Sequence, residues 1–206
     1  MARLKVGVLI SGRGSNLQSL LDSCAAPDFP AEIVLVISNI ADAFGLTRAE
    51  KAGVPTAVIS HKDYASRLDF DRAVDARLRQ SQVELVCLAG FMRLLTPEFV
   101  DGWKGRMLNI HPSLLPSFKG MHTHAQALAA GVKLHGCTVH QVTAELDAGP
   151  IVAQAAVPVL AGDDEDSLAA RVLRAEHRLY PLALKLVAEG GAGEDPESVL
   201  FSPPVE

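Results

Sequence analysis

Apolar and polar positions along the chain form two kinds of segment that follow one another in turn. Short, nearly continuous apolar runs are typical of parallel strands buried on both faces, and they predict strands at 4–10, 31–39, 55–60, 83–91 and 106–111. The segments between them have the apolar spacing of helices, which predicts helices at 16–24, 45–54, 63–81 and 96–103. This succession predicts an α/β fold, with an open, mostly parallel, twisted sheet and helices on both faces.

The pattern becomes less regular after residue 111. A loop rich in proline and glycine is followed by a predicted helix at 125–131. Residues 134–159 then have the pattern of two strands around a turn at Ala148-Gly149, as in a hairpin. With these two strands, the expected sheet has about seven.

The longest helical pattern starts near Asp166 or Ser167 and continues to residue 190, and Pro181 predicts a kink or break within it. We find no internal repeat and no linker, so a single domain is expected over residues 1–190. The remaining residues, 191–206, are predicted to be a C-terminal tail. The domain divides into an N-terminal half at about 1–105 and a second half at about 106–190.

Composition narrows the classes of function. The 206 residues carry a net charge of −5 and include no lysine- or arginine-rich block, so a small anionic substrate is a more suitable partner than nucleic acid. The three cysteines are an odd number without metal-ligand spacing, which is typical of reduced thiols in a cytoplasmic protein. No apolar segment reaches the ~18–20 residues of a membrane span, and the N-terminus resembles a strand more than a signal peptide. We therefore expect a cytoplasmic protein with small-molecule substrates. The sequence does not give its oligomeric state, for which a monomer and a homodimer are the two possibilities.

The first motif that could bind a ligand is SGRGSN, residues 11–16, between a predicted strand and a predicted helix. Glycines let the backbone turn tightly, and the amides of Gly14, Ser15 and Asn16 lie at a helix N-terminus, where an anion is favoured. The full glycine spacing of a dinucleotide site and the lysine of a P-loop are both missing from the motif. It predicts a phosphate site, unless it is a plain turn between strand and helix.

The second motif is Asn109-Ile110-His111, at the carboxyl end of a predicted strand. Alternate residues of a strand lie on one face, so the Asn109 carboxamide and the His111 imidazole are expected side by side. Ligands of open α/β sheets collect at this end of the strands. The alternative is that His111 serves only the packing of the core or loop.

A third motif holds Asp147, in a turn just before Gly149-Pro150. His140 alternates with Thr138 on one face of the preceding strand. A carboxylate that faces an imidazole orients it and stabilises its protonated form, which suits proton transfer and an oxyanion. The alternative is a turn aspartate that bonds its own backbone.

Two other interpretations are weaker. Several histidines near 122–124 suggest a metal site, but they lie on separate elements and lack typical zinc spacing, so no metal is expected. Cys137 near His140 suggests a thiol nucleophile, but Cys137 lies inside a strand pattern. Cys87 lies in an apolar strand and is expected in the core.

In combination the motifs are far more specific than any one of them. In order, SGRGSNLQ, AGFMRLL, LNIHPSLLPSFKGMHTHAQAL, HGCTVHQV, ELDAGPIV and EHRLYPLAL closely resemble the phosphoribosylglycinamide formyltransferase family, from about residue 4 to 187. The resemblance implies a Rossmann-like formyltransferase fold and 10-formyltetrahydrofolate as co-substrate. It also implies formyl transfer to the glycyl amine of glycinamide ribonucleotide in de novo purine biosynthesis, by direct attack through a tetrahedral intermediate.

The resemblance also implies a role for individual residues. It assigns catalysis to Asn109, His111 and Asp147. It assigns the ribonucleotide to Gly14, Ser15 and Asn16 at the phosphate and to Glu176 at the ribose. It assigns the folate to Arg67, Met92, Arg93, Leu94, Leu95, Asn109, Thr143, Ala144, Glu145, Leu146 and Asp147.

One residue departs from the family pattern. Position 144 is alanine where an acidic residue is more usual, so pterin contacts of this loop would rely on backbone groups. The resemblance further implies a cis peptide bond between Leu115 and Pro116, which costs little before proline.

Other functions fit parts of the pattern. A 10-formyltetrahydrofolate hydrolase shares the core but adds an N-terminal module, which is not expected here because the first predicted strand begins at Leu4. A methionyl-tRNA formyltransferase adds a C-terminal RNA-binding domain, and this chain is expected to be too short and too acidic for one. A non-catalytic anion- or nucleotide-binding module would keep the glycine loop but has no need of Asn109, His111 and Asp147 together.

Overall fold

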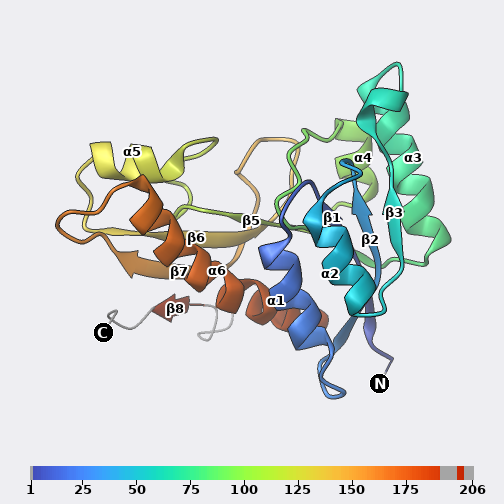
Figure 1. The fold of residues 1–206 in the computed structure, drawn as a ribbon, viewed down its shortest axis with the longest axis horizontal. Helices are drawn as coiled ribbons and strands as arrows, with labels where there is room; N and C mark the ends of the chain where they lie inside the picture. Colours follow the sequence, from blue (N-terminus) through green and yellow to red (C-terminus); the bar gives the residue numbers. More distant parts are fainter. Residues whose placement is uncertain (1, 191–198, 202–206) are drawn as a thin grey trace. The chain divides into compact units, whose positions relative to one another are not determined.

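The computed structural model describes residues 2–190 and 199–201 (Figure 1). The chain forms two compact units. Unit 1 comprises Met1–Asn109 with Val142–Ala144, and unit 2 comprises Ile110–Gln141 with Glu145–Glu206.

Unit 1 is built from alternating strands and helices. Its elements are β1 Leu4–Ile10, α1 Ser15–Cys24, β2 Ala31–Ser38, α2 Phe44–Lys51, β3 Thr56–Val58, the 3-10 helix η1 His61–Asp63, α3 Arg67–Gln80, β4 Leu85–Leu88, α4 Pro97–Gly102 and the start of β5 Met107–His111. The strand pairs β3-β2, β2-β1, β1-β4 and β4-β5 are all parallel. Short helical crossovers between neighbouring parallel strands are the arrangement that the sequence pattern predicts.

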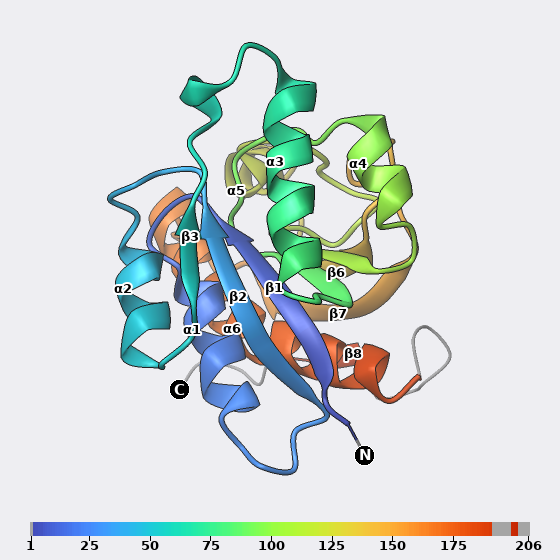
Figure 2. The same ribbon diagram turned by 90° about the vertical axis from the view of Figure 1, so that its right-hand side faces the viewer.

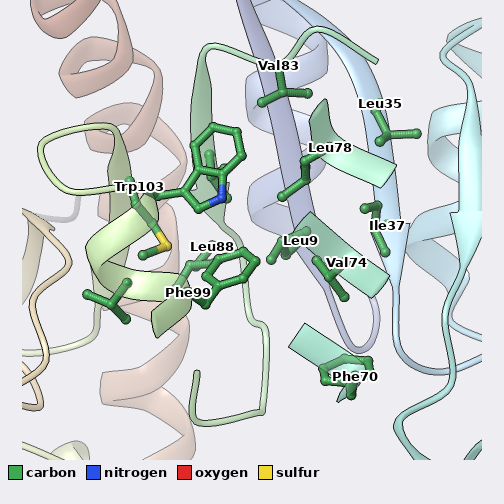
Figure 3. Close-up of a cluster of buried hydrophobic side chains, with 13 residues drawn as sticks. Leu9, Leu35, Ile37, Phe70, Val74, Leu78, Val83, Leu88, Phe99 and Trp103 are labelled. Atoms are coloured by element: carbon green, nitrogen blue, oxygen red, sulfur yellow. The ribbon is translucent and has the colours of Figure 1, made fainter. Parts of the chain in front are cut away.

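Helices α3 and α4 cover one face of the unit 1 sheet, and α1 and α2 cover the other (Figure 2). Alternate residues of the strands therefore enter different layers. The layer under α3 and α4 is one cluster of buried residues, which includes the aromatic side chains of Trp103, Phe70 and Phe99 (Figure 3). Both faces are apolar, which explains the nearly continuous hydrophobic runs in the sequence.

Unit 2 contains the carboxyl end of β5, α5 Thr123–Ala129, β6 Leu134–Gln141, β7 Ile151–Pro158, α6 Glu165–Ala188 and β8 Val199–Phe201. Strands β6 and β7 are antiparallel, as expected for the predicted hairpin, and β7 pairs with β8 in parallel. Helix α6 packs against β6 and β7. Within the described residues, the strands follow the hydrogen-bonded order β3-β2-β1-β4-β5-β6-β7-β8. The predicted class, an open and mostly parallel α/β sheet, is confirmed.

Two helix predictions differ from the structure. The predicted break at Pro181 is wrong, because α6 is continuous from Glu165 to Ala188, while the alternative of a kink there stays a prediction. A proline inside a helix costs roughly 3 kcal/mol, but α6 buries residues on both sides of it, including Tyr180 and Leu184. The helix predicted at 63–81 starts later, because Ser66 caps α3 by accepting a hydrogen bond from Asp69 N. The predicted tail lies outside the described residues except for β8.

Candidate active site

The glycine loop joins β1 to α1 in unit 1. Gly14 is the N-cap of α1 and has φ 67°, a conformation that glycine adopts without strain. Among the described residues, no side chain caps this end of α1, and its first turn holds no acidic residue. The first turn of α1 therefore holds no carboxylate that would offset the positive end of the helix, which suits an anionic ligand.

Helix α2 packs against this loop and donates hydrogen bonds to it, a contact that the sequence did not predict. Gly45 N donates to Gly12 O at 3.1 Å, and Arg48 Nε donates to Arg13 O at 2.9 Å. A Cβ on Gly14 would lie 2.7 Å from the Gly45 Cα, so the two backbones touch here. Gly45, in the sequence AFGL, was a possible sign of a close backbone contact. The sequence does not indicate its partner, because Gly14 lies 31 residues earlier.

The segment that follows β4 carries four of the predicted folate residues, also in unit 1. Met92 and Leu94 are 71% and 61% exposed, which is unusual for large apolar side chains, and Arg93 is exposed as well. Leu95 is half-buried and packs against the core cluster. Met92 N donates to Ser11 Oγ at 2.8 Å, which fixes the start of the segment. The result is an apolar surface with an ordered backbone, as a flat aromatic ligand requires.

The other predicted folate residues are on α3 and in the loop after β6. Arg67 is the first residue of α3 and is exposed. Thr143 and Ala144 are exposed and belong to unit 1. Glu145 and Leu146 are exposed in unit 2, where Lys119 Nζ lies 3.6 Å from Glu145 Oε1.

His111 and Asp147 meet in unit 2, although 35 residues separate them in the sequence. Asp147 Oδ2 lies 3.5 Å from His111 Nδ1 and accepts a hydrogen bond from Gly120 N at 2.9 Å. On the other side of the ring, His111 Nε2 lies 3.0 Å from Phe118 O. Both ring nitrogens thus face oxygen atoms that accept hydrogen bonds, and an imidazolium has an N–H for each. Both side chains are buried, which strengthens electrostatic interactions between them.

His140 is a third member of this cluster, and the sequence analysis did not include it among the catalytic residues. Its Nε2 lies 3.8 Å from Asp147 Oδ1, and its Nδ1 is 3.0 Å from Gln141 O. Burial lowers the pKa of His140 more than the neighbouring Asp147 carboxylate raises it. The ring is therefore neutral near pH 7, with Nδ1 as donor to the Gln141 carbonyl. The alternation of Thr138 and His140 at the end of a strand was the signal in the sequence.

The backbone around the cluster is unusual. Asp147 has φ 50° and Phe118 has φ 53°, both in the left-handed region that side chains rarely adopt. Strained residues of this kind persist where surrounding contacts hold them, often at functional sites. The Leu115-Pro116 bond is cis, as the resemblance implies.

The remaining predicted site residues are Asn109 and Glu176. Asn109 lies on β5, two positions before His111, so both residues are on one face of that strand. Glu176 lies on α6 and is only 7% exposed, unlike an ordinary solvated helix charge.

Cys137 does not have the properties of a nucleophile. Burial raises the pKa of its thiol strongly, and the negative charge of Glu176 adds to this effect. Burial likewise raises the pKa of Cys24 to about 11. A thiol with a raised pKa carries little thiolate near pH 7, and the thiolate is the reactive form.

The residues that the structure describes offer neither a metal site nor a membrane-spanning helix. Within that part of the chain, no three histidine, cysteine, aspartate or glutamate side chains are grouped so as to hold a metal ion. Within the same residues, no helix combines the length and apolar character needed to cross a membrane.

Comparison with known proteins relates the chain to enzymes of known name. A phosphoribosylglycinamide formyltransferase from Escherichia coli is 49% identical over 187 residues, which is 91% of this chain and 88% of that protein. The trifunctional purine biosynthetic protein adenosine-3 of Gallus gallus is 57% identical over 188 residues, 91% of this chain. This chain spans only 19% of the length of that larger protein.

Solved structures give the same relationship. The crystal structure of phosphoribosylglycinamide formyltransferase from Brucella melitensis has a TM-score of 0.87 and 56% sequence identity, over 90% of this chain and 96% of that one. Glycinamide ribonucleotide transformylase 1 from Symbiobacterium toebii has a TM-score of 0.90 and 48% identity, over 97% of this chain and 95% of that one. The family model described as formyl transferase matches residues 4–184. The chain therefore belongs to the formyl transferase family.

Proposed function

We propose that this chain transfers the formyl group of 10-formyltetrahydrofolate to the glycyl amine of glycinamide ribonucleotide, as a cytoplasmic step of de novo purine biosynthesis. The observation that carries the proposal is the buried cluster of His111 and Asp147 on a chain that is 49% identical to a protein named for this reaction over 88% of its length. The substrates are small molecules, and neither nucleic acid nor a membrane takes part. The working state is a monomer or a homodimer.

The ribonucleotide phosphate would bind at the glycine loop. The first amides of α1, from Gly14 to Asn16, are donors at the positive end of a helix, and φ 67° at Gly14 lets the backbone approach closely. Glu176 would accept hydrogen bonds from the ribose hydroxyls, a role suited to a buried carboxylate.

The folate would bind on the apolar segment at 92–95. Exposed Met92 and Leu94 supply apolar cover for the pterin, and the backbone groups of the segment read its edge. Arg67 and the loop at 143–147 would contribute further contacts. Because residue 144 is alanine, the contacts of this loop with the pterin would rely on backbone groups.

The reaction would proceed by direct attack. The amine nitrogen bonds to the formyl carbon, and negative charge develops on the formyl oxygen. His111 as imidazolium and the Asn109 amide are donors suited to that oxygen. For this, His111 Nε2 must exchange its present acceptor, Phe118 O at 3.0 Å, for the formyl oxygen.

Asp147 would keep His111 protonated and oriented while the intermediate forms. When the intermediate collapses, the bond from the formyl carbon to the folate nitrogen breaks, and that nitrogen takes up the proton lost by the amine. Asp147 would assist this transfer, directly or through water. No covalent enzyme intermediate is needed, which agrees with the raised pKa of the Cys137 thiol.

A formyl-transfer assay tests the proposal. The protein is incubated with 10-formyltetrahydrofolate, with and without glycinamide ribonucleotide, and both the loss of the formyl donor and the formylated product are measured. Transfer that depends on the ribonucleotide is the expected result. Loss of the formyl group without ribonucleotide would instead identify a hydrolase, and binding without any loss would identify a non-catalytic module. His111→Asn serves as the inactive control.

A further inference from the structure

A chain of hydrogen bonds crosses the carboxyl ends of four neighbouring strands in unit 1. Asn39 Nδ2 lies 3.2 Å from His61 Nδ1, Ser11 Oγ donates to Asn39 Oδ1 at 2.6 Å, and Met92 N donates to Ser11 Oγ at 2.8 Å. His61, Asn39, Ser11 and Met92 follow β3, β2, β1 and β4, which is also the order of these strands in the sheet. We call these four residues the strand-end chain.

Each bond in the strand-end chain has a defined direction. An amide NH2 only donates, so His61 Nδ1 is the acceptor and its ring proton is on Nε2. Asn39 is 3% exposed, and its oxygen and nitrogen both have partners here. The Ser11 hydroxyl gives its one proton to Asn39 and accepts from Met92. Removing the Ser11 hydroxyl therefore takes away the donor to the buried Asn39 Oδ1 and the acceptor of the exposed Met92 amide.

The strand-end chain is also supported by packing and by the backbone. Ser11 N donates to Gly90 O at 3.1 Å, so Ser11 holds this segment at two points. The His61 ring meets the ring of Phe70 edge-on, with centroids 6.2 Å apart, and Phe70 stacks on Phe91 with centroids 6.5 Å apart. The segment before Met92 is thus fixed through both polar and aromatic contacts.

Ser11 is the first residue of SGRGSN, and Met92 is the first residue of the segment at 92–95. If the function proposed above holds, these two segments bind different ligands. We propose that Ser11 is a positioning residue that couples ribonucleotide binding at the glycine loop to folate binding at 92–95. One hydroxyl joins both segments, so a ligand that orders one of them reduces the entropy cost of ordering the other.

The coupling between the two binding sites is measured without catalytic turnover, because tetrahydrofolate has no formyl group to transfer. Calorimetry gives the Kd of glycinamide ribonucleotide alone and with saturating tetrahydrofolate. In the wild type the ratio of the two Kd values should be about fivefold or more, the equivalent of one hydrogen bond. In Ser11→Ala the ratio should fall to about one. An unchanged ratio in Ser11→Ala, or a ratio of one in the wild type, would overturn the proposal.

Two control variants separate coupling from general damage. Ser11→Thr keeps a hydroxyl and should retain most of the wild-type ratio. Ser81→Ala removes another half-buried serine hydroxyl, which accepts from Arg77 Nη1 at 2.6 Å at the C-terminal end of α3. Ser81→Ala should leave the ratio of the two Kd values unchanged. If this ratio fell as far in Ser81→Ala as in Ser11→Ala, Ser11 would have no specific role.

A second measurement needs no variant, in case Ser11→Ala does not fold. Ribonucleotide alone should slow hydrogen exchange at the Met92 amide of the wild type, because that amide is bonded to the glycine loop. The Thr96 amide, which donates to Asp71 Oδ2 at 2.6 Å outside the strand-end chain, should not change. Equal exchange at Met92 with and without ribonucleotide would refute the coupling. If the wild type binds neither ligand, the proposed function fails instead, and the two failures remain distinguishable.

Discussion

The contact between Gly14 and Gly45 allows a sharp test of the phosphate loop. Gly14→Ala adds one methyl group at φ 67°, 2.7 Å from the Gly45 Cα. Gly53→Ala is its matched control, since Gly53 has φ 72° in the same unit but open space within 4 Å of an added Cβ. The two variants therefore share the backbone strain and differ in the collision.

The strain alone costs roughly 1–2 kcal/mol in each variant. For a chain of this length, that lowers Tm by about 2–4 °C for each kcal/mol. In Gly14→Ala the two backbones must also separate by about 1 Å to reach normal carbon contacts. This would stretch the Gly45 N to Gly12 O bond, now 3.1 Å, and move the amides that face the phosphate. Losing one charge-assisted hydrogen bond, about 1.5–3 kcal/mol, predicts ribonucleotide binding weaker by about 10- to 100-fold.

Calorimetry of each variant with glycinamide ribonucleotide and, separately, with tetrahydrofolate measures these effects, and thermal unfolding measures the strain. We expect Gly14→Ala to lose ribonucleotide affinity and to keep its affinity for tetrahydrofolate. Gly53→Ala should lose stability alone. Equal ribonucleotide affinity in the two variants would show that the loop does not bind the phosphate, and equal weakening of both ligands by Gly14→Ala would show that the damage is not local.

Three further predictions concern unit 2. Asp147→Asn should bind both substrates but turn over at least ~10²-fold more slowly, and its loss should be far from additive with that of His111→Asn in steady-state kinetics, whereas additive losses would mean that the residues act independently. Glu176→Gln should raise the ribonucleotide KM more than it lowers kcat, and an unchanged KM would remove Glu176 from the ribose site. Burial lowers the pKa of His135 from 6.5 to about 4, so between these values the unfolded chain binds a proton that the folded chain does not. Stability should therefore fall as pH decreases through this range, and His135→Gln should flatten that fall in Tm measured against pH; an equally steep fall in the variant would contradict the assignment.

Local patterns in the sequence were sufficient for most of the strands and helices. The run at 4–10 coincides with β1, and the helix predicted at 96–103 is α4, which Thr96 caps by accepting a hydrogen bond from Phe99 N. These features depend on residues close together in the chain, namely apolar spacing, caps and turn residues. The same holds for Asn109 and His111, because a spacing of two on a strand by itself puts them on one face.

Tertiary structure decided what depends on distant contacts. The continuous α6 survives Pro181 because packing on both sides of the proline outweighs its cost. The approach of Gly45 to Gly14 follows from where α2 packs, which the spacing of apolar residues does not specify.

The candidate site divides in the same way. The sequence presented His111, His140 and Asp147 as separate residues at the ends of elements, and the family resemblance paired two of them. The fold supplies the 3.5 Å between His111 Nδ1 and Asp147 Oδ2, and it adds His140 on the other carboxylate oxygen. The bonds of Ser11 to Asn39 and Met92 likewise depend on strand order. Hydrophobic periodicity specifies which residues are buried, but only the folded chain specifies which buried polar groups become partners.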